Sequence, residues 1–278
     1  MMQVRFAFHF FLFFLVAAPV SAAAPPEEES PLDVEELMRD VQRVHFMDTA
    51  AWSRFQFRRQ VLKQRLNRAG EVEKAKLYEF QVTPVPGGFD EELVSLDGHP
   101  PTRREVRQHR KEARFSRRYE AARSGPGGDD DSPLRLLLHR SSYQLSGRES
   151  VNGIECYRLD FSSDEKSGRS GLRQRIAQAM AGSLWIAADG HHLVRARART
   201  VRPVSIAMSL AKVYSMEIEL DSVPVMPGLW LPERLEVQTE ARVSWWPIRR
   251  RSIFLYSNFH PVRGGPAEGG GVGLAGSP

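Results

Sequence analysis

Few side chains in this sequence have the types and spacing that metal chemistry needs. His191 and His192 are adjacent, so on a strand their rings would point to opposite faces and could not easily share one ion. They follow the turn signal Asp189-Gly190, and solvated turn residues are the simpler interpretation. Asp129–Asp131 could attract Ca²⁺, but calcium needs several oxygens in a fixed loop, so a solubilising loop is simpler. We expect no metal site and no cofactor.

Nucleophiles are no better placed. Ser141, Ser142 and Ser146 lie outside any Gly-x-Ser-x-Gly motif, and no Gly-rich phosphate loop is present. Carboxylate pairs fall on polar strand faces, where cross-strand charge pairing explains them. Cys156 is the single cysteine, which excludes an intramolecular disulfide and suits a small buried side chain. We therefore expect no catalytic residue and no enzyme.

One set of arginines has a spacing that suits anionic partners. Arg195, Arg197 and Arg199 are two apart, so on a strand they line one face. They could contact phospholipid headgroups or anionic lipoprotein partners. Alternatively they form a solvated sheet face, paired with glutamates such as Glu217 and Glu219.

A second cationic set follows two tryptophans. Trp245 and Trp246 precede Arg249, Arg250 and Arg251 at a strand junction. Indoles favour the membrane boundary, and cations are attracted to anionic lipids. These five residues are a candidate membrane- or partner-facing surface, and an ordinary solvated junction is the alternative.

The remaining candidate site is a set of apolar residues in the second half of the chain. They could line an acyl-binding cavity, and methionines suit an irregular surface of this kind. They could equally be core beneath a helix, and the pattern leaves both interpretations open. The residues are Leu184, Ile186, Met208, Leu210, Met216, Ile218, Leu231, Leu235 and Val237.

Strands must position most of these residues. Alternation of period two begins after Trp52, and Asn152-Gly153 is the strongest hairpin signal. Asp33 can cap an amphipathic helix of about three turns that reaches Val44, and Thr102 with Glu105 forms a capping box before a basic helix. The fold class is α+β, mainly β: a curved antiparallel half-barrel of long strands, with helices covering the concave apolar face.

The N-terminal residues indicate export. Arg5 precedes an apolar run over 6–18, interrupted only by His9, and small residues follow, as in a secretory signal peptide. The run is well short of the roughly 20 residues that span a bilayer. We expect a signal peptide over 1–24. The product should be periplasmic, and it should not be lipid-anchored because no cysteine lies near the cleavage site.

The rest of the chain suits one large domain. A disordered Pro/Glu-rich leader is expected over 25–32, a half-barrel domain over 33–263 and a flexible Gly-rich tail over 264–278. This length can bury a core without disulfides. The formal net charge is +5, with basic and acidic residues mixed, whereas nucleic-acid binding needs a basic patch. We expect no nucleic-acid partner and a monomer.

Strand-and-turn segments carry a family resemblance. They lie in order at 78–84, 93–100, 151–153, 182–186, 231–237 and 256–259. With them the chain resembles the outer-membrane lipoprotein carrier superfamily (LolA/LolB-like), particularly its exported proteins. The resemblance implies a many-stranded half-barrel around helices, with a hydrophobic cavity that shelters acyl chains. This chain departs from the dedicated carrier in its extra basic helix near 103–123 and in its Gly-rich tail.

The function expected from this resemblance is a periplasmic carrier. It would bind lipid or lipoprotein acyl chains in its cavity and be linked to outer-membrane lipoprotein sorting. The alternative is a periplasmic sensor or scaffold that binds an envelope protein through the same fold. Co-purifying lipid would favour the first, and a stable protein partner without lipid would favour the second.

Overall fold

The computed structural model describes residues 32–85, 88–111, 138, 141–163, 172–206 and 211–262. The chain divides into two units, Met1–Leu32 and Asp33–Pro278, and every described helix and strand belongs to the second. The expected signal peptide, nearly all of the leader and the Gly-rich tail lie outside the described residues. So do the acidic run over 129–131 and the candidate site residues Met208 and Leu210.

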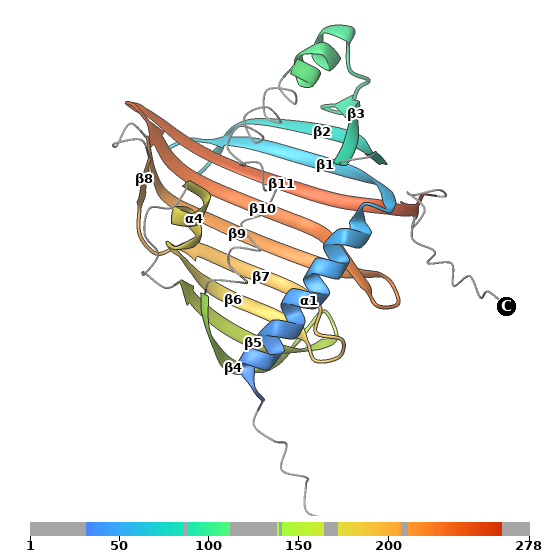
Figure 1. The fold of residues 1–278 in the computed structure, drawn as a ribbon. Coiled ribbons are helices and arrows are strands. Elements are labelled where there is room, and N and C mark those ends of the chain that lie inside the picture. The colour runs from blue at the N-terminus through green and yellow to red at the C-terminus, as the bar shows by residue number, and fades with distance from the viewer. Residues whose placement is uncertain are drawn as a thin grey trace, which may run out of the picture. The chain divides into compact units, whose positions relative to one another are not determined.

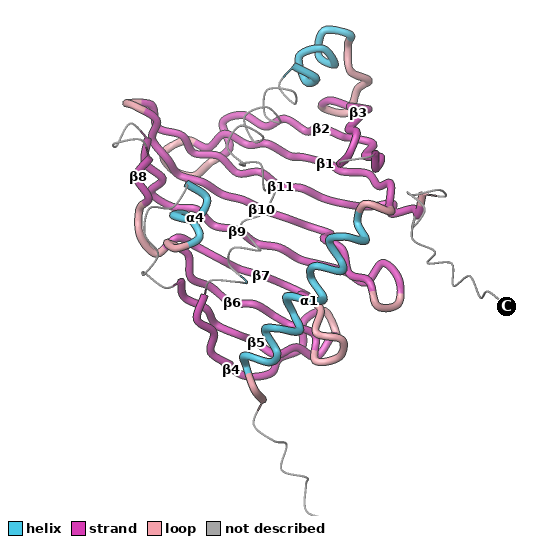
Figure 2. Tube along the Cα trace, viewed as in Figure 1, coloured by secondary structure: helices cyan, strands magenta, loops and turns pink. Residues whose placement is uncertain are grey.

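Strands dominate the second unit, as Figure 2 shows. The helical elements are α1 (Val34–Trp52), α4 (Leu172–Ala177) and a stretch over 103–111. The strands are β1 (Phe55–Leu66), β2 (Val72–Val85), β3 (Gly88–Leu96), β4 (Ser141–Val151), β5 (Ile154–Ser163), β6 (Met180–Ala187), β7 (Leu193–Thr200), β8 (Val204–Ile206), β9 (Ala211–Met226), β10 (Leu229–Val243) and β11 (Trp246–Pro261). The expected class, α+β and mainly β, is confirmed.

The strands build one antiparallel sheet that curves but does not close. Its order is β3-β2-β1-β11-β10-β9-β7-β6-β5-β4, with β8 paired to β9. The first strand thus lies beside the last, since Val61 of β1 pairs with Phe254 of β11 (Figure 1). Among the described strands, β3 and β4 end the sheet. This is the half-barrel expected from the sequence.

The first helix is capped as predicted but is longer than predicted. Oδ1 of Asp33 accepts from the backbone N–H of Glu35 at 2.9 Å, which satisfies a donor that the first turn leaves free. The apolar repeat reaches Val44, yet the helix continues to Trp52 and spans 19 residues. The additional turns carry Asp48 and Trp52, both of which contact the sheet. Tertiary contacts therefore extend α1 beyond its own amphipathic pattern.

Two other local signals are confirmed. Asn152 and Gly153 both have positive φ, 54° and 82°, which is the two-residue turn that matches the twist of a hairpin. The backbone N–H of Thr102 donates to the Glu105 carboxylate at 2.7 Å, and the backbone N–H of Glu105 donates to the Thr102 hydroxyl at 3.3 Å. This capping box starts the helix at 103, which is described as far as 111.

The register divides the sheet into two faces, because directly opposed residues share a face. Leu235 lies opposite Phe254 and Leu220, whereas its neighbour Glu236 lies opposite Glu219. We call the first the apolar face and the second the charged face. Trp52 at the end of α1 packs against the core cluster of the apolar face around Phe57, Val61, Phe80, Val82 and Leu93. The helix therefore covers the apolar face, crossing the strands at one end (Figure 1).

Candidate binding face

Four of the predicted site residues come together with Phe254 on the apolar face. Ile218 of β9 lies opposite Val237 of β10, and Leu235 lies opposite Phe254 of β11. Met216 follows on the same face, two residues from Ile218. All are half-buried, unlike the core residues around them. We call this set the apolar strip: Met216, Ile218, Leu235, Val237 and Phe254.

The other described members of the predicted set are more completely buried. Leu184 and Ile186 of β6 are 0% exposed, and Leu231 of β10 is 1% exposed. Leu231 packs with Phe55 and Leu229 beneath the C-terminal end of α1. These three side chains belong to the packed core, whereas the apolar strip is half-buried.

A buried polar contact fixes α1 over one end of the apolar face. Nδ1 of His192 lies 2.9 Å from Oδ2 of Asp48, and both residues are buried. The backbone N–H of Trp230 donates to the other carboxylate oxygen at 3.4 Å. The Trp230 indole stacks on the His192 ring, with centroids 5.6 Å apart. Asp48 thus links the helix to the β6–β7 turn and to β10.

The interpretation of the histidine pair as solvated turn residues is therefore wrong for His192. The ring is buried because the turn lies under α1, where Asp48 supplies the polar partner that a buried imidazole requires. The two residues are 144 positions apart, and neither belongs to a local motif. No pattern in the sequence pairs them.

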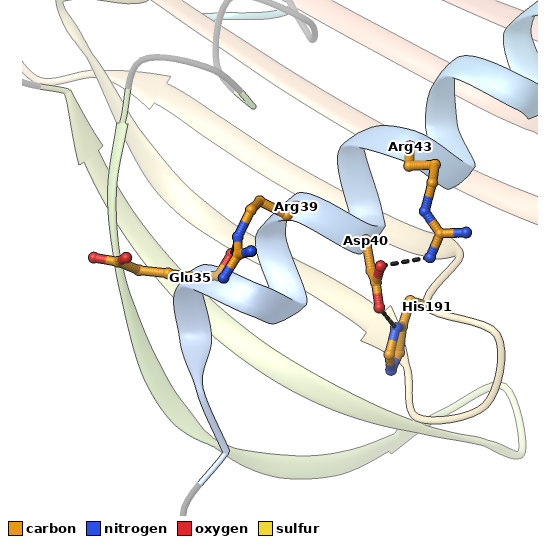
Figure 3. A network of polar contacts seen from close by, with 5 residues as sticks. All are labelled: Glu35, Arg39, Asp40, Arg43 and His191. Carbon is orange, nitrogen blue, oxygen red and sulfur yellow. Dashed lines mark hydrogen bonds and ion pairs between the residues drawn. The ribbon is translucent and has the colours of Figure 1, made fainter.

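His191 makes a second, more exposed link between the same turn and α1. Its Nδ1 lies 3.2 Å from Oδ2 of Asp40, whose other oxygen accepts from Arg43 at 2.5 Å (Figure 3). The hydrogen bond from Arg43 lowers the pKa of Asp40, and His191 adds to this effect. The two imidazoles bind different carboxylates, so they do not converge on one ion. Within the described residues no three metal-ligating side chains gather.

The opposite end of the strands carries α4. Ile176 of α4 packs with Val204 and Val213, and Met216 of the strip joins this cluster. A pocket of about 420 Å³ lies beside it, lined by Arg199, Thr200, Val201, Ser215, Met216 and Glu217. Only Met216 of the strip contributes to the pocket. Its polar lining suits water or a small polar group better than an acyl chain.

The charged face explains the alternating arginines of β7. Nε of Arg195 lies 2.6 Å from Asp221, and Nε of Arg197 lies 3.6 Å from Glu219. Arg199 lies opposite Glu217 in the register. Of the two interpretations, the solvated and paired sheet face is confirmed, because each arginine faces a carboxylate across the β7–β9 pair.

The tryptophan hairpin is the most exposed apolar part of the described chain. Trp245 and Trp246, in and after the β10–β11 turn, are 75% and 66% exposed. Of the three following arginines, Arg249 pairs with Glu240 at 2.6 Å and Arg251 with Glu236, both on the charged face.

Arg250 differs from its two neighbours. It lies opposite Thr239 and is on the apolar face. It has no carboxylate partner among the described residues. The three predicted arginines therefore do not form one cluster, because alternate strand residues point to opposite faces.

The apolar face also holds a balanced ion pair among its aromatic side chains. Nη2 of Arg59 lies 2.7 Å from the Glu91 carboxylate, and the guanidinium lies 5.0 Å from the centroid of the Phe80 ring. Burial raises the pKa of Tyr256 beside them. The positive charge of Arg59 is compensated within the protein.

In the described part of the chain, no helix has the length and apolar character needed to span a membrane.

No family model and no curated protein matches the chain. A LolA superfamily protein from Nitrosomonas europaea is similar in structure, with 10% identity, a TM-score of 0.34 and coverage of 84% of this chain and 94% of that chain. A domain from Vibrio parahaemolyticus, described as an outer membrane lipoprotein-sorting protein, has 9% identity, a TM-score of 0.37 and coverage of 81% and 93%.

A chain of the MucA/MucB complex of Pseudomonas aeruginosa is also similar, at 9% identity, a TM-score of 0.22 and coverage of 80% and 99%. The LolA-like resemblance expected from the sequence thus has counterparts among solved structures. Identities and TM-scores of this size assign no ligand and no partner to this chain.

Proposed function

We propose that this protein is a periplasmic carrier that binds lipids or lipoproteins by sheltering an acyl chain on the apolar strip. The observation that carries the proposal is the half-buried state of Met216, Ile218, Leu235, Val237 and Phe254, five apolar side chains contiguous on one face of three adjacent strands. A contiguous apolar surface that is partly exposed to solvent is typical of a binding site. The proposed cellular location rests on the N-terminal export pattern.

Binding of this kind needs no covalent chemistry. Each buried methylene contributes about 0.8 kcal/mol, so affinity should rise roughly fourfold per added methylene until the chain outgrows the strip. The Asp48–His192 contact holds α1 at one end of the face, and Ile176 of α4 packs at the other end. These contacts support the proposal that α1 and α4 limit the length of acyl chain that the apolar strip can hold.

Native mass spectrometry with lipid extraction tests the proposal on the mature protein purified from the periplasm. We expect a bound acylated species that is lost in Ile218→Glu, since a carboxylate in the strip would have to be desolvated. Leu255→Glu is the matched control, because Leu255 is next to Phe254 but lies on the charged face and is already 40% exposed. A bare mass that stays unchanged after incubation with phospholipid or lipopeptide would refute the carrier.

The tryptophan hairpin is the proposed contact with a membrane or partner. Trp245 and Trp246 are exposed at the β10–β11 turn, and of the three arginines that follow, Arg250 is exposed and has no carboxylate partner among the described residues. Exposed indoles and cations suit an interface with anionic lipid. Flotation with vesicles containing phosphatidylglycerol should decrease in Trp245→Ser/Trp246→Ser, and equal flotation of wild type and variant would refute this contact.

A second candidate function is a sensor or scaffold that binds an envelope protein. It is favoured by the position of β3 and β4, which end the strand order among the described strands, since a bound peptide can extend a free edge. A stable protein partner recovered with no bound lipid would support this function over the carrier.

A further inference from the structure

We infer that five cations on the apolar face bind the anionic headgroup of an amphiphile whose acyl chain lies on the apolar strip. This inference rests on the proposed acyl binding and adds the class of ligand. The cations come from β1, β2 and β11, near the β1–β2 turn. We call them the basic patch: Lys63, Arg65, Lys74, Lys76 and Arg250.

The register brings the patch together. Lys63 of β1 lies directly opposite Lys76 of β2. Arg65 lies opposite Lys74 of β2 on one side and opposite Arg250 of β11 on the other. Directly opposed residues on a sheet have Cβ atoms roughly 5 Å apart. Three like-charge pairs therefore occupy neighbouring positions of one face.

Such pairs oppose folding unless an anion compensates them, because like charges directly opposite each other are destabilising. Several other cations of this sheet face acids, since Arg195 faces Asp221 and Arg59 binds Glu91, whereas Arg242 lies opposite Lys212. In the basic patch, Arg65 alone forms a close ion pair among the described residues, with Glu73 at 3.0 Å. The pKa of Glu105, which the hydrogen bonds from Thr102 lower, is lowered further with the help of the charge of Lys76. Lys63 lies over the Tyr78 ring at 5.1 Å, which leaves its charge without an anion.

The patch is also open to solvent. Lys63, Arg65, Lys74 and Arg250 are exposed, and Lys76 is half-buried. An anionic group can therefore reach several cations at once. An exposed patch whose positive charge is only partly compensated favours the binding of an anion.

The patch continues directly into the apolar strip. Lys63 lies opposite Ser252, and Ser252 lies opposite Val237, which lies opposite Ile218. In the next row, Arg250 lies opposite Thr239 and Thr239 opposite Met216. Neighbouring strands are about 4.8 Å apart, so the patch and the strip are separated by only one or two strands. One molecule with an acyl chain and an anionic group fits both.

The experiment compares two lysolipids that carry the same acyl chain, lysophosphatidylglycerol and lysophosphatidylcholine, below their critical micelle concentrations. Calorimetric titration of the wild-type protein at low salt should show at least about tenfold tighter binding of the anionic one. Lys63→Gln/Lys76→Gln should abolish this preference while the neutral-headgroup analogue still binds. Salt at 0.5 M should also reduce the preference, roughly as charge screening predicts.

The matched control removes the same charge from the other face. Arg58 and Arg242 are exposed, lie on the charged face and have no ion-pair partner among the described residues. Arg58→Gln/Arg242→Gln should keep the preference. If the control loses it equally, net charge rather than the patch selects the ligand and the inference fails.

The other outcomes separate the inference from the proposed function. Equal binding of both lysolipids to the wild type would overturn the headgroup site and leave acyl binding intact. Binding of neither would overturn both. Inorganic phosphate is the probe for a free anion, and phosphate binding as tightly as lysophosphatidylglycerol would overturn the link between patch and strip.

Thermal unfolding without ligand distinguishes a binding role from a structural one. Lys74→Gln removes the like-charge pair with Arg65 and keeps the Lys63–Tyr78 contact, so its Tm should equal or exceed that of the wild type. A lower Tm would mean that this lysine stabilises the strands and would contradict the electrostatic repulsion on which the inference rests.

Discussion

The Asp48 carboxylate lies 2.9 Å from Nδ1 of His192, and this buried contact joins the end of α1 to the turn between β6 and β7. The same carboxylate accepts from the backbone N–H of Trp230 in β10. One side chain thus holds the helix against two separate parts of the sheet. The position of α1 over the sheet therefore depends on Asp48.

Asp48→Ala should destabilise the protein by roughly 2–3 kcal/mol, because it leaves a buried imidazole and a backbone N–H without an acceptor. Urea unfolding followed by circular dichroism measures this loss. Asp48→Asn should recover part of it, since an amide oxygen can still accept. Asp40→Ala removes the exposed counterpart and should change the midpoint little. Equal losses for Asp48→Ala and Asp40→Ala would contradict this account.

Gly182→Ala should be among the most damaging single changes in the sheet. An added Cβ would lie 1.9 Å from the backbone oxygen of Arg197 on β7, so β6 and β7 would have to separate. We expect a loss above about 3 kcal/mol in urea unfolding. Ala181→Gly on the same strand removes a methyl group instead and should cost about 1 kcal/mol. A near-neutral Gly182→Ala would show that the strands are less closely paired than described.

The Cys156 thiol should react slowly in the folded protein. The side chain is fully buried, and burial raises the pKa of the thiol, so less of the reactive thiolate is present at pH 8. Labelling with a chromogenic disulfide should be at least about a hundredfold faster in 6 M guanidinium than in buffer. Comparable rates would place Cys156 on the surface.

Part of the stability should depend on pH through Asp160. Hydrogen bonds from Ser146 at 2.6 Å and from Ser183 at 2.5 Å lower the pKa of this carboxyl group. The hydrogen bonds therefore contribute to the free energy of unfolding at pH values above the ordinary carboxyl pKa. This contribution is lost as the pH falls through the lowered pKa that Asp160 has in the folded protein.

Ser146→Ala/Ser183→Ala should therefore lower stability at pH 7 and have a smaller effect near pH 2. The loss should be below about 1 kcal/mol, because the carboxylate is half-exposed and solvent screens it. Urea unfolding across this pH range measures the difference. Ser142→Ala is the control, since its hydroxyl contacts Ser162 instead. A loss that does not depend on pH would contradict the role of Asp160.

Local patterns were enough to predict much of the fold. The Asn152-Gly153 turn, the Asp33 cap and the capping box at Thr102 each depend on neighbouring residues, and the structure shows all three. Period-two alternation also placed Ile218 and Val237 on one face of their strands. These features follow from residues close together in the chain.

The contacts that shape the site are between distant residues and were not predictable. Nothing local indicates that β1 lies beside β11, so the adjacency of Arg65 and Arg250 emerges only from the register. The same holds for Asp48 and His192. The alternation of Arg249, Arg250 and Arg251 between faces was available from strand geometry alone, because all three residues lie within one strand.

Photolabelling tests acyl binding on the strip most directly. The probe is palmitate with a diazirine near its methyl end, added to the folded protein, and the labelled peptides are mapped by mass spectrometry. Labels should concentrate on Ile218, Val237 and Phe254, and unlabelled lysophosphatidylglycerol should compete for them. Labels confined to the charged face, or labelling that unlabelled lipid does not reduce, would contradict the proposal.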